Sequence, residues 1–315
     1  RGTNVNWFLP WTIYLIGTAV TFLNNALLCF IEGCNLVGLA QKIKLYGSLS
    51  MFIIMIVGLY IGLDLFALSI SMFLSALISC FLIYKTLDTL ILQLISVSKE
   101  YTYSWMSEFF PLFWRSAISW GSGYFIFQFI TPFVFRYYGA VEAGRIGISM
   151  ALWTALYNIS YVWVYVVRPN INFYVSRREW DQLDRLFKRR LLMSIVTYIT
   201  GTVAVFLLIL FLRDRIAMIG RFAGNTAMIF LAVAWFLNTI ISSIAVYFRA
   251  HKEEPLVVLS LVSSVYVVII TILCAKYLSQ EYILLGFFSS SVLGLPWVLV
   301  LFNRKRREWH YECTA

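Results

Sequence analysis

The chain of 315 residues contains about nine apolar runs, each long enough to cross a bilayer as a helix. A transmembrane helix needs about 20 predominantly apolar residues, because the hydrocarbon core is about 30 Å thick and a helix rises about 1.5 Å per residue. The runs cover residues 8–31, 46–63, 65–84, 111–135, 143–167, 191–212, 226–248, 255–275 and 282–302. Their apolar residues are continuous rather than alternating, which favours helices over barrel strands. The sequence therefore predicts an all-α polytopic membrane protein with about nine transmembrane helices.

The composition supports lipid as the solvent of this chain. Hydrophobic residues make up 61% of the sequence and charged residues 13%, whereas soluble domains carry about 25% charged residues. The net charge of +10 comes from basic residues that cluster between the apolar runs. This placement indicates the positive-inside bias of membrane proteins and argues against nucleic acid as a partner.

The distribution of Lys and Arg between the runs predicts the orientation. Eighteen of these residues lie in one set of alternate loops and seven in the other, and the cluster Arg304–Arg307 belongs to the richer set. The richer set is predicted to be cytoplasmic, so the C-terminus lies inside and residue 1 outside. Because no signal peptide precedes an outside residue 1, we expect that a further segment comes before it.

An internal repeat divides the chain. The triplet Phe22-Leu23-Asn24 recurs as Phe236-Leu237-Asn238, and in each copy two further spans follow, separated by a short outer loop. Both copies run in the same direction, which predicts a parallel repeat about the membrane normal. We therefore expect residues 1–100 to be the back half of a first bundle, residues 101–303 a second six-helix bundle, and residues 304–315 a basic cytoplasmic tail. The first bundle would lack its first three helices.

The sequence contains no motif of enzyme or cofactor chemistry. There is no Gly-rich phosphate loop, no nucleophile motif and no set of residues with metal-ligand spacing. We expect no cofactor and no metal. The basic stretch 177–190 carries Trp180, Leu183, Leu186 and Phe187 at helical spacing, which predicts an amphipathic helix lying on an anionic leaflet.

Polar residues concentrate between positions 108 and 170. Arginines stand near the ends of the fourth and fifth runs, at Arg115, Arg136 and Arg168, and Pro132 interrupts the fourth run. Polar groups at membrane depth are costly and usually face a cavity or a partner helix. The arginines have two readings. They snorkel to the interface, or they line a path for an anionic substrate, because the guanidinium fork matches phosphate oxygens.

Four segments of the chain form recognisable motifs: Pro111-Leu112-Phe113-Trp114-Arg115, Ser119 to Gln128, Ala143 to Gly147 and Leu183 to Phe187. These motifs resemble bacterial polysaccharide flippases of the multidrug/oligosaccharidyl-lipid/polysaccharide exporter superfamily. The resemblance implies a fold of two six-helix bundles that rock by alternating access in the bacterial inner membrane. It implies that the substrate is an undecaprenyl-diphosphate-linked sugar, flipped to the outer leaflet. Drug-exporting members of the superfamily use a proton or sodium gradient, so either ion is an expected coupling partner.

The resemblance and the polar residues together predict a substrate site in the fourth and fifth spans. We expect Gln128, Asn158 and Tyr161 to face the cavity between the bundles and to contact sugar hydroxyls. Arg115 would hold the diphosphate at the cytoplasmic mouth, and Arg145 would receive it at the outer side. The partners implied are the lipid bilayer and an anionic lipid-linked sugar.

Three other functions remain open from the sequence. A drug or cation antiporter of the same superfamily is the first, although the cationic bias of the polar residues disfavours a cationic substrate. A membrane-embedded polysaccharide polymerase or acyltransferase is the second, and it would need a catalytic loop or a histidine or carboxylate in mid-span. The third is a structural scaffold without transport activity.

Overall fold

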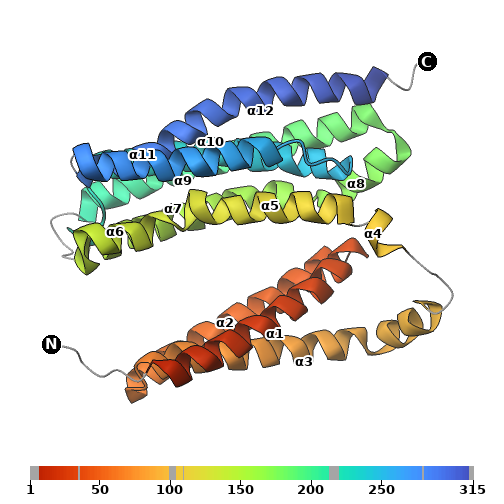
Figure 1. Cartoon of the computed structure of the whole chain (residues 1–315). Helices are drawn as coiled ribbons and strands as arrows, with labels where there is room; N and C mark the ends of the chain where they lie inside the picture. Colours follow the sequence, from red (N-terminus) through yellow and green to blue (C-terminus); the bar gives the residue numbers. More distant parts are fainter. Residues whose placement is uncertain are drawn as a thin grey trace. The chain divides into compact units, whose positions relative to one another are not determined.

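A computed structural model describes residues 7–34, 36–98, 104–108, 110–212, 220–278 and 280–311 (Figure 1). All regular structure in these ranges is helical. The chain divides into two compact units, Arg1–Tyr103 and Ser104–Ala315. The predicted all-α fold is confirmed, and eight of the described helices are long and apolar enough to cross a membrane.

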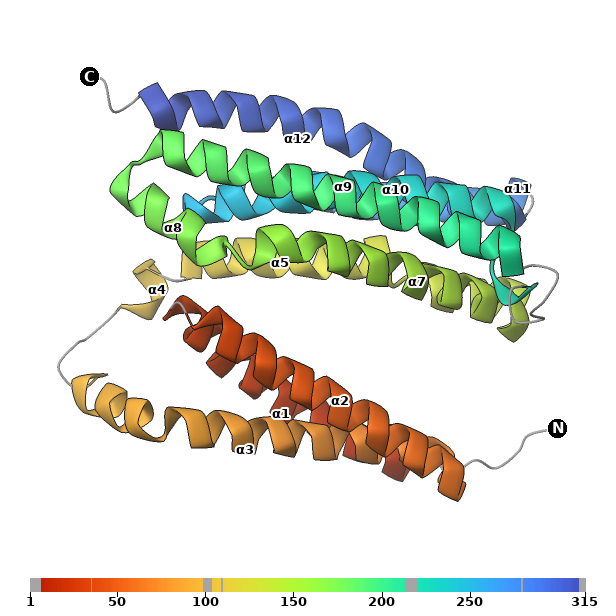
Figure 2. The same ribbon diagram turned by 180° about the vertical axis from the view of Figure 1, so that it is seen from behind.

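The first unit consists of three long helices, α1 (Phe8–Gly33), α2 (Val37–Ile61) and α3 (Leu65–Ser98). α3 packs against both α1 and α2, and the three lie side by side in Figures 1 and 2. The turn between α2 and α3 is short because Gly62 adopts a left-handed conformation at the end of α2, with φ of 85°. Glycine reaches this conformation without steric cost.

Small residues set the close packing within the first unit. A side chain added at Gly17 of α1 would come within 2.9 Å of the Phe73 backbone of α3. An added side chain at Gly58 of α2 would come within 2.9 Å of Ala67 of α3. Lipid tails are as apolar as the helix surfaces, so association in a membrane depends on such close approach.

The second unit is built on six long helical segments and several short ones. Its elements are α4 (Trp105–Glu108), α5 (Phe110–Phe127), α6 (Ile130–Tyr138), α7 (Ala140–Tyr165), α8 (Arg168–Arg177), α9 (Trp180–Leu212), α10 (Asn225–Ala250), α11 (Val257–Tyr277), η2 (Gln280–Tyr282) and α12 (Leu285–Tyr311). α5 packs on α11, α7 on α9, and α10 on both α7 and α12. Figure 2 shows α7, α9 and α12 running along the unit.

The predicted fourth span, 111–135, is two helices rather than one continuous helix. α5 ends at Phe127, and the backbone N–H groups of Gln128 and Phe129 both donate to the carbonyl of Tyr124, at 2.8 and 3.0 Å. Pro132 stands four residues after Gln128, where its ring would clash with the Gln128 carbonyl in a regular helix. The proline therefore interrupts the helix as predicted, and the chain restarts as α6.

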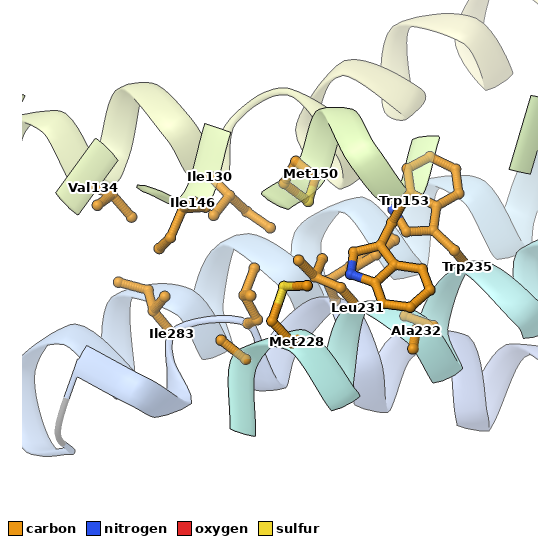
Figure 3. Packing of buried hydrophobic residues seen from close by; sticks show 14 of the residues in the cluster. Ile130, Val134, Ile146, Met150, Trp153, Met228, Leu231, Ala232, Trp235 and Ile283 are labelled. Atoms are coloured by element: carbon orange, nitrogen blue, oxygen red, sulfur yellow. The ribbon is translucent and has the colours of Figure 1, made fainter. Parts of the chain in front are cut away.

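The core of the second unit forms around α10. Of the most apolar stretch of α10, 56% is buried, against 6% for α9. Figure 3 shows Leu231 and Trp235 of α10 facing Met150 and Trp153 of α7, with Ile130 of α6 nearby. The outer surfaces are strongly apolar, as lipid-facing surfaces should be, and Trp120 of α5 is 75% exposed.

Residues 177–190 do not form a separate interfacial helix, which corrects the prediction from their amphipathic pattern. They end α8 and then enter α9, which runs without a break from Trp180 to Leu212. Leu183 and Phe187 are buried against α10 and α12 rather than exposed to lipid. The pattern was correct about an apolar face, but this face packs on protein.

At the C-terminus, most of the predicted basic tail, 304–315, is helical. Residues 304–311 continue α12, and Arg306 and Trp309 contact other helices of the second unit. Residues 312–315 lie outside the described residues. Within the basic cluster, Lys305 and Arg306 are therefore held by ion pairs to Glu253 and Asp184, whereas Arg304 and Arg307 are exposed.

Candidate substrate-binding site

Arg115 stands in the second turn of α5 with an exposed side chain. Its guanidinium carbon lies 5.9 Å from the ring centroid of the neighbouring Trp114. It takes part in no ion pair within the described part of the chain. One turn further on, the hydroxyl of Ser119 lies 3.2 Å from that of Ser260 on α11, which fixes this part of α5. Among the described residues, no carboxylate therefore competes for the charge of Arg115.

Gln128 lies at the break between α5 and α6, and its side chain is exposed. At this break the regular series of helical backbone hydrogen bonds is interrupted, because the N–H groups of Gln128 and Phe129 both donate to the Tyr124 carbonyl. Irregular backbone at membrane depth occurs where it is buried in protein or lines a water-filled cavity.

Arg145 lies in the second turn of α7 and is not a free cation. Its guanidinium donates to Glu142 at 2.7 Å, and 44% of its side chain is exposed. Such an exposed pair three residues apart stabilises the helix weakly. An anionic ligand at Arg145 would therefore compete with Glu142, a cost that the sequence prediction did not include.

Asn158 and Tyr161 lie three residues apart on α7, so their side chains are neighbours on one side of the helix. Asn158 is exposed and Tyr161 is half-buried. The ring of Tyr161 stacks on Tyr157, with centroids 5.5 Å apart, and meets Tyr165 edge-on at 6.2 Å. These two predicted residues therefore share one region of the helix surface.

The structure does not bring all five predicted residues into one cluster. No hydrogen bond or ion pair between described atoms joins any two of them. Arg145 and Asn158 are thirteen positions apart, which is about 20 Å along a helix.

Sequence reasoning missed an aromatic row beside Tyr161. Tyr157 and Tyr165 extend Tyr161 in both directions at a spacing of four residues, and Tyr157 contacts Trp235 of α10 with centroids 4.9 Å apart. At the predicted cytoplasmic end, the guanidinium of Arg168 lies 4.8 Å from the Tyr165 ring centroid, a cation–π distance. The four-residue spacing of the tyrosines was visible in the sequence and could have indicated this row.

A second constellation lies at the predicted cytoplasmic ends of α9, α10 and α12, and sequence reasoning missed it too. We call it the His251 cluster. It consists of Trp180 and Asp184 of α9, Tyr247 of α10, His251 and Glu253 after α10, and Lys305, Arg306, Trp309 and His310 of α12. Its members are far apart in the sequence, and no local motif unites them.

Beside the His251 cluster, the surface forms an open polar hollow of about 430 Å³. It is lined by Asp181, Asp184, Arg185, Lys188 and Arg306. Asp184 is bound to Arg306 and also accepts a hydrogen bond from the Tyr247 hydroxyl at 3.1 Å. The hollow contains charges of both signs that partly neutralise each other. Its lining therefore indicates no preference for an anionic ligand.

The comparisons with known proteins give a fold. No protein-family model matches the sequence, and none of the curated proteins matches it. Among solved structures, the crystal structure of MATE in the bent conformation is similar, with a TM-score of 0.62. The two sequences are 15% identical, and the likeness covers 94% of this chain and 69% of that chain. Over almost its whole length, this chain therefore has the fold of a MATE protein.

Proposed function

We propose that this protein is a membrane transporter that moves an anionic lipid-linked oligosaccharide or polysaccharide precursor across the bilayer. The observation that carries the proposal is the likeness of nearly the entire chain to a MATE structure, combined with eight described helices that are long and apolar enough to cross a membrane. In the exporter superfamily to which MATE transporters belong, two helix bundles alternate between inward and outward access. A scaffold without transport activity would not need this architecture.

The charges of the second unit favour an anionic substrate over a cationic one. Arg115 is exposed and has no carboxylate partner among the described residues, and Arg168 is half-buried over Tyr165. The described carboxylates of this unit stand near helix ends, such as Glu142 in the first turn of α7 and Asp181 in the first turn of α9. A cation crossing the membrane needs carboxylates or carbonyls along its path, whereas a diphosphate needs arginines.

The proposed roles of the five residues follow from their depths and chemistry. Arg115 holds the diphosphate at the cytoplasmic mouth by its bidentate fork. Gln128, Asn158 and Tyr161 offer hydrogen bonds to sugar hydroxyls in mid-membrane. Arg145 receives the diphosphate at the outer side in exchange for Glu142, and a proton or sodium gradient drives the cycle. We propose the bacterial inner membrane as the location, with the C-terminus in the cytoplasm.

The second candidate is a drug or cation antiporter, and the likeness to a MATE structure supports it equally. A polymerase or acyltransferase is less favoured, because one route to such an enzyme, a catalytic histidine in mid-span, is not offered by either histidine. His251 caps the C-terminus of α10, and His310 lies in the last turn of α12.

Deleting the gene in the producing cell tests the proposal. A flippase is expected to leave its lipid-linked sugar accumulated on the cytoplasmic leaflet, with less polysaccharide at the cell surface. Plasmid-borne wild-type protein should restore the surface polymer. Normal surface polysaccharide together with increased sensitivity to cationic drugs would favour the antiporter instead.

A further inference from the structure

His251 is enclosed by aromatic rings from three helices. Its imidazole is parallel to the indole of Trp309 on α12, with centroids 3.8 Å apart and an angle of 10° between the planes. Tyr247 of α10 and Trp180 of α9 also stack against it, at 5.1 and 5.7 Å. The imidazole is thus the common contact of the ends of α9, α10 and α12.

The hydrogen bond of His251 fixes which ring nitrogen carries the proton in the neutral form. Nδ1 lies 2.9 Å from the backbone carbonyl of Tyr247, and because a carbonyl only accepts, Nδ1 must carry the proton. In the neutral ring, Nε2 then has no hydrogen. Nε2 is buried and has no hydrogen-bond partner within the described part of the chain. A second proton on this atom would therefore be buried without an acceptor.

The charged and titratable groups around the ring come from each helix that packs on it. They are Asp181 and Asp184 of α9, Tyr247 and Arg249 of α10, Glu253 and Glu254 in the turn after α10, and Lys305, Arg306, Glu308 and His310 of α12.

The carboxylates near the ring already have partners. Glu253 accepts from the Trp309 indole N–H at 3.1 Å and pairs with Lys305 at 3.0 Å. Asp184 pairs with Arg306. A protonated His251 that turned toward one of these carboxylates would therefore compete with the partners that the carboxylate already has.

Two effects of protonation oppose each other. The indole face of Trp309 attracts an imidazolium by a cation–π interaction. Against this, a buried charge whose N–H has no acceptor loses its hydration without replacement, and this cost is the larger one. Burial accordingly lowers the pKa of His251, and the Tyr247 carbonyl and the Glu253 charge offset this only partly.

We propose that the His251 cluster is a pH-sensitive clasp, in which protonation of His251 breaks its stack with Trp309 and releases the end of α12 from α10. Glu253 is the acceptor that the imidazolium takes, so its bonds to Trp309 and Lys305 are lost together. Acidification on this side of the membrane, predicted to be the cytoplasm, then loosens one end of the second unit. The clasp does not depend on which substrate the protein transports.

The first test uses the fact that the chain has two histidines. NMR of protein labelled only in histidine gives two imidazole signals, and His310→Phe assigns them. At pH 7.5 the His251 signal is expected to show the neutral form with the proton on Nδ1. It should titrate below the ordinary range of histidine. Titration at or above that range would overturn the proposal.

The second test measures whether α12 moves. Spin labels at Lys252 and Arg307, both exposed, report the separation of the α10 and α12 ends in a variant without the native cysteines. The distance distribution should be narrow at pH 7.5 and gain a longer component as His251 titrates. His251→Phe keeps a stacking ring but cannot titrate, so its distribution should stay narrow. His310→Phe should still respond.

A label pair at Arg221 and Glu281, near the opposite end of the unit, controls for global unfolding. Its distance should stay constant over the pH range in which the clasp opens. An unchanged Lys252–Arg307 distance while His251 titrates would overturn the proposal. So would a response of His251→Phe equal to that of the wild type.

Discussion

Asn24 of α1 and Asn238 of α10 make equivalent contacts in the two units. The side-chain amide of Asn24 donates to the Ala76 carbonyl of α3 at 2.8 Å, and that of Asn238 donates to the Ser291 hydroxyl of α12 at 2.8 Å. Both amides are buried, and both join the first helix of a triplet to its third. The contact partners are 52 and 53 residues away. This equivalence supports the repeat inferred from the matching triplets in the sequence.

The two asparagines should contribute similarly to stability. Replacing Asn24 or Asn238 by Ala removes an interhelical hydrogen bond, which in membrane proteins contributes about 0.6–1.7 kcal/mol. We expect both variants to unfold earlier in a denaturant titration in detergent. Asn158→Ala is the matched control, because Asn158 is exposed on α7 and should change stability little. Equal effects of all three substitutions would show that the buried amides have no special role.

The repeat also predicts geometry. Helices α1–α3 should superpose on α10–α12 in an experimental structure, with Asn24 falling on Asn238. The rotation relating them should run about the membrane normal. A superposition that needs an inverted axis, or that fits fewer than three helices, would contradict the parallel repeat.

Gly17 should be essential for the packing of α1 on α3. Gly17→Ala places a methyl group within 2.9 Å of the Phe73 backbone, which must move, and we expect a loss of about 1–3 kcal/mol. Gly38→Ala on α2 is the control, because no atom lies within 4 Å of the added carbon. This control should be neutral or slightly stabilising. Thermal unfolding in detergent measures both variants, and an unaffected Gly17→Ala would contradict the close approach.

Acid should destabilise the protein through His251. A histidine whose folded pKa lies below its unfolded value contributes stability that is present above about pH 6.5 and is lost as the pH falls through the folded pKa. The slope reaches at most about 1.4 kcal/mol per pH unit for one group. We expect the denaturant concentration at the unfolding midpoint to decrease when the pH is lowered from 7.5 to 5. This decrease should be smaller in His251→Phe. Identical slopes in both proteins would assign the acid effect to other groups.

Arg115 should matter for transport beyond its charge. Arg115→Lys keeps the charge and loses the bidentate fork, so it should reduce transport partly, whereas Arg115→Ala should reduce it more. Arg189→Ala, an exposed arginine on α9, is the control and should transport normally. Expression must be equal in all variants. If Arg115→Ala transports as the wild type does, Arg115 only anchors α5 at the membrane interface.

Much of the fold was predictable from the sequence, because lipid imposes simple rules on it. The length of each apolar run fixes a spanning helix. Pro132 correctly indicated an interruption, although it occurs at Gln128, four residues earlier, where the proline ring meets a carbonyl. The amphipathic face of 180–187 was visible, but a periodic pattern does not distinguish lipid from a protein partner. The structure shows that Leu183 packs on protein.

The candidate site was less accessible to sequence reasoning. A single sequence gives the position of a residue along each helix, and from this Gln128 and Asn158 are predicted near mid-membrane. A sequence does not show which side chains pair with each other. The ion pair between Arg145 and Glu142 was therefore missed, although the two residues are three positions apart. The His251 cluster was missed for a different reason. It joins Asp184 to Arg306 across 122 residues, and only packing brings them together.

Reconstitution of the protein with a fluorescent polyprenyl-diphosphate-linked sugar tests the central claim most directly. The lipid is placed in vesicles with and without protein, and a membrane-impermeant quencher reports how much of it changes leaflet. A cationic dye in parallel vesicles reports antiport. We predict protein-dependent movement of the diphosphate-linked sugar and none of the dye. Movement of the dye under a proton or sodium gradient, with the lipid-linked sugar left in its original leaflet, would contradict the proposed function.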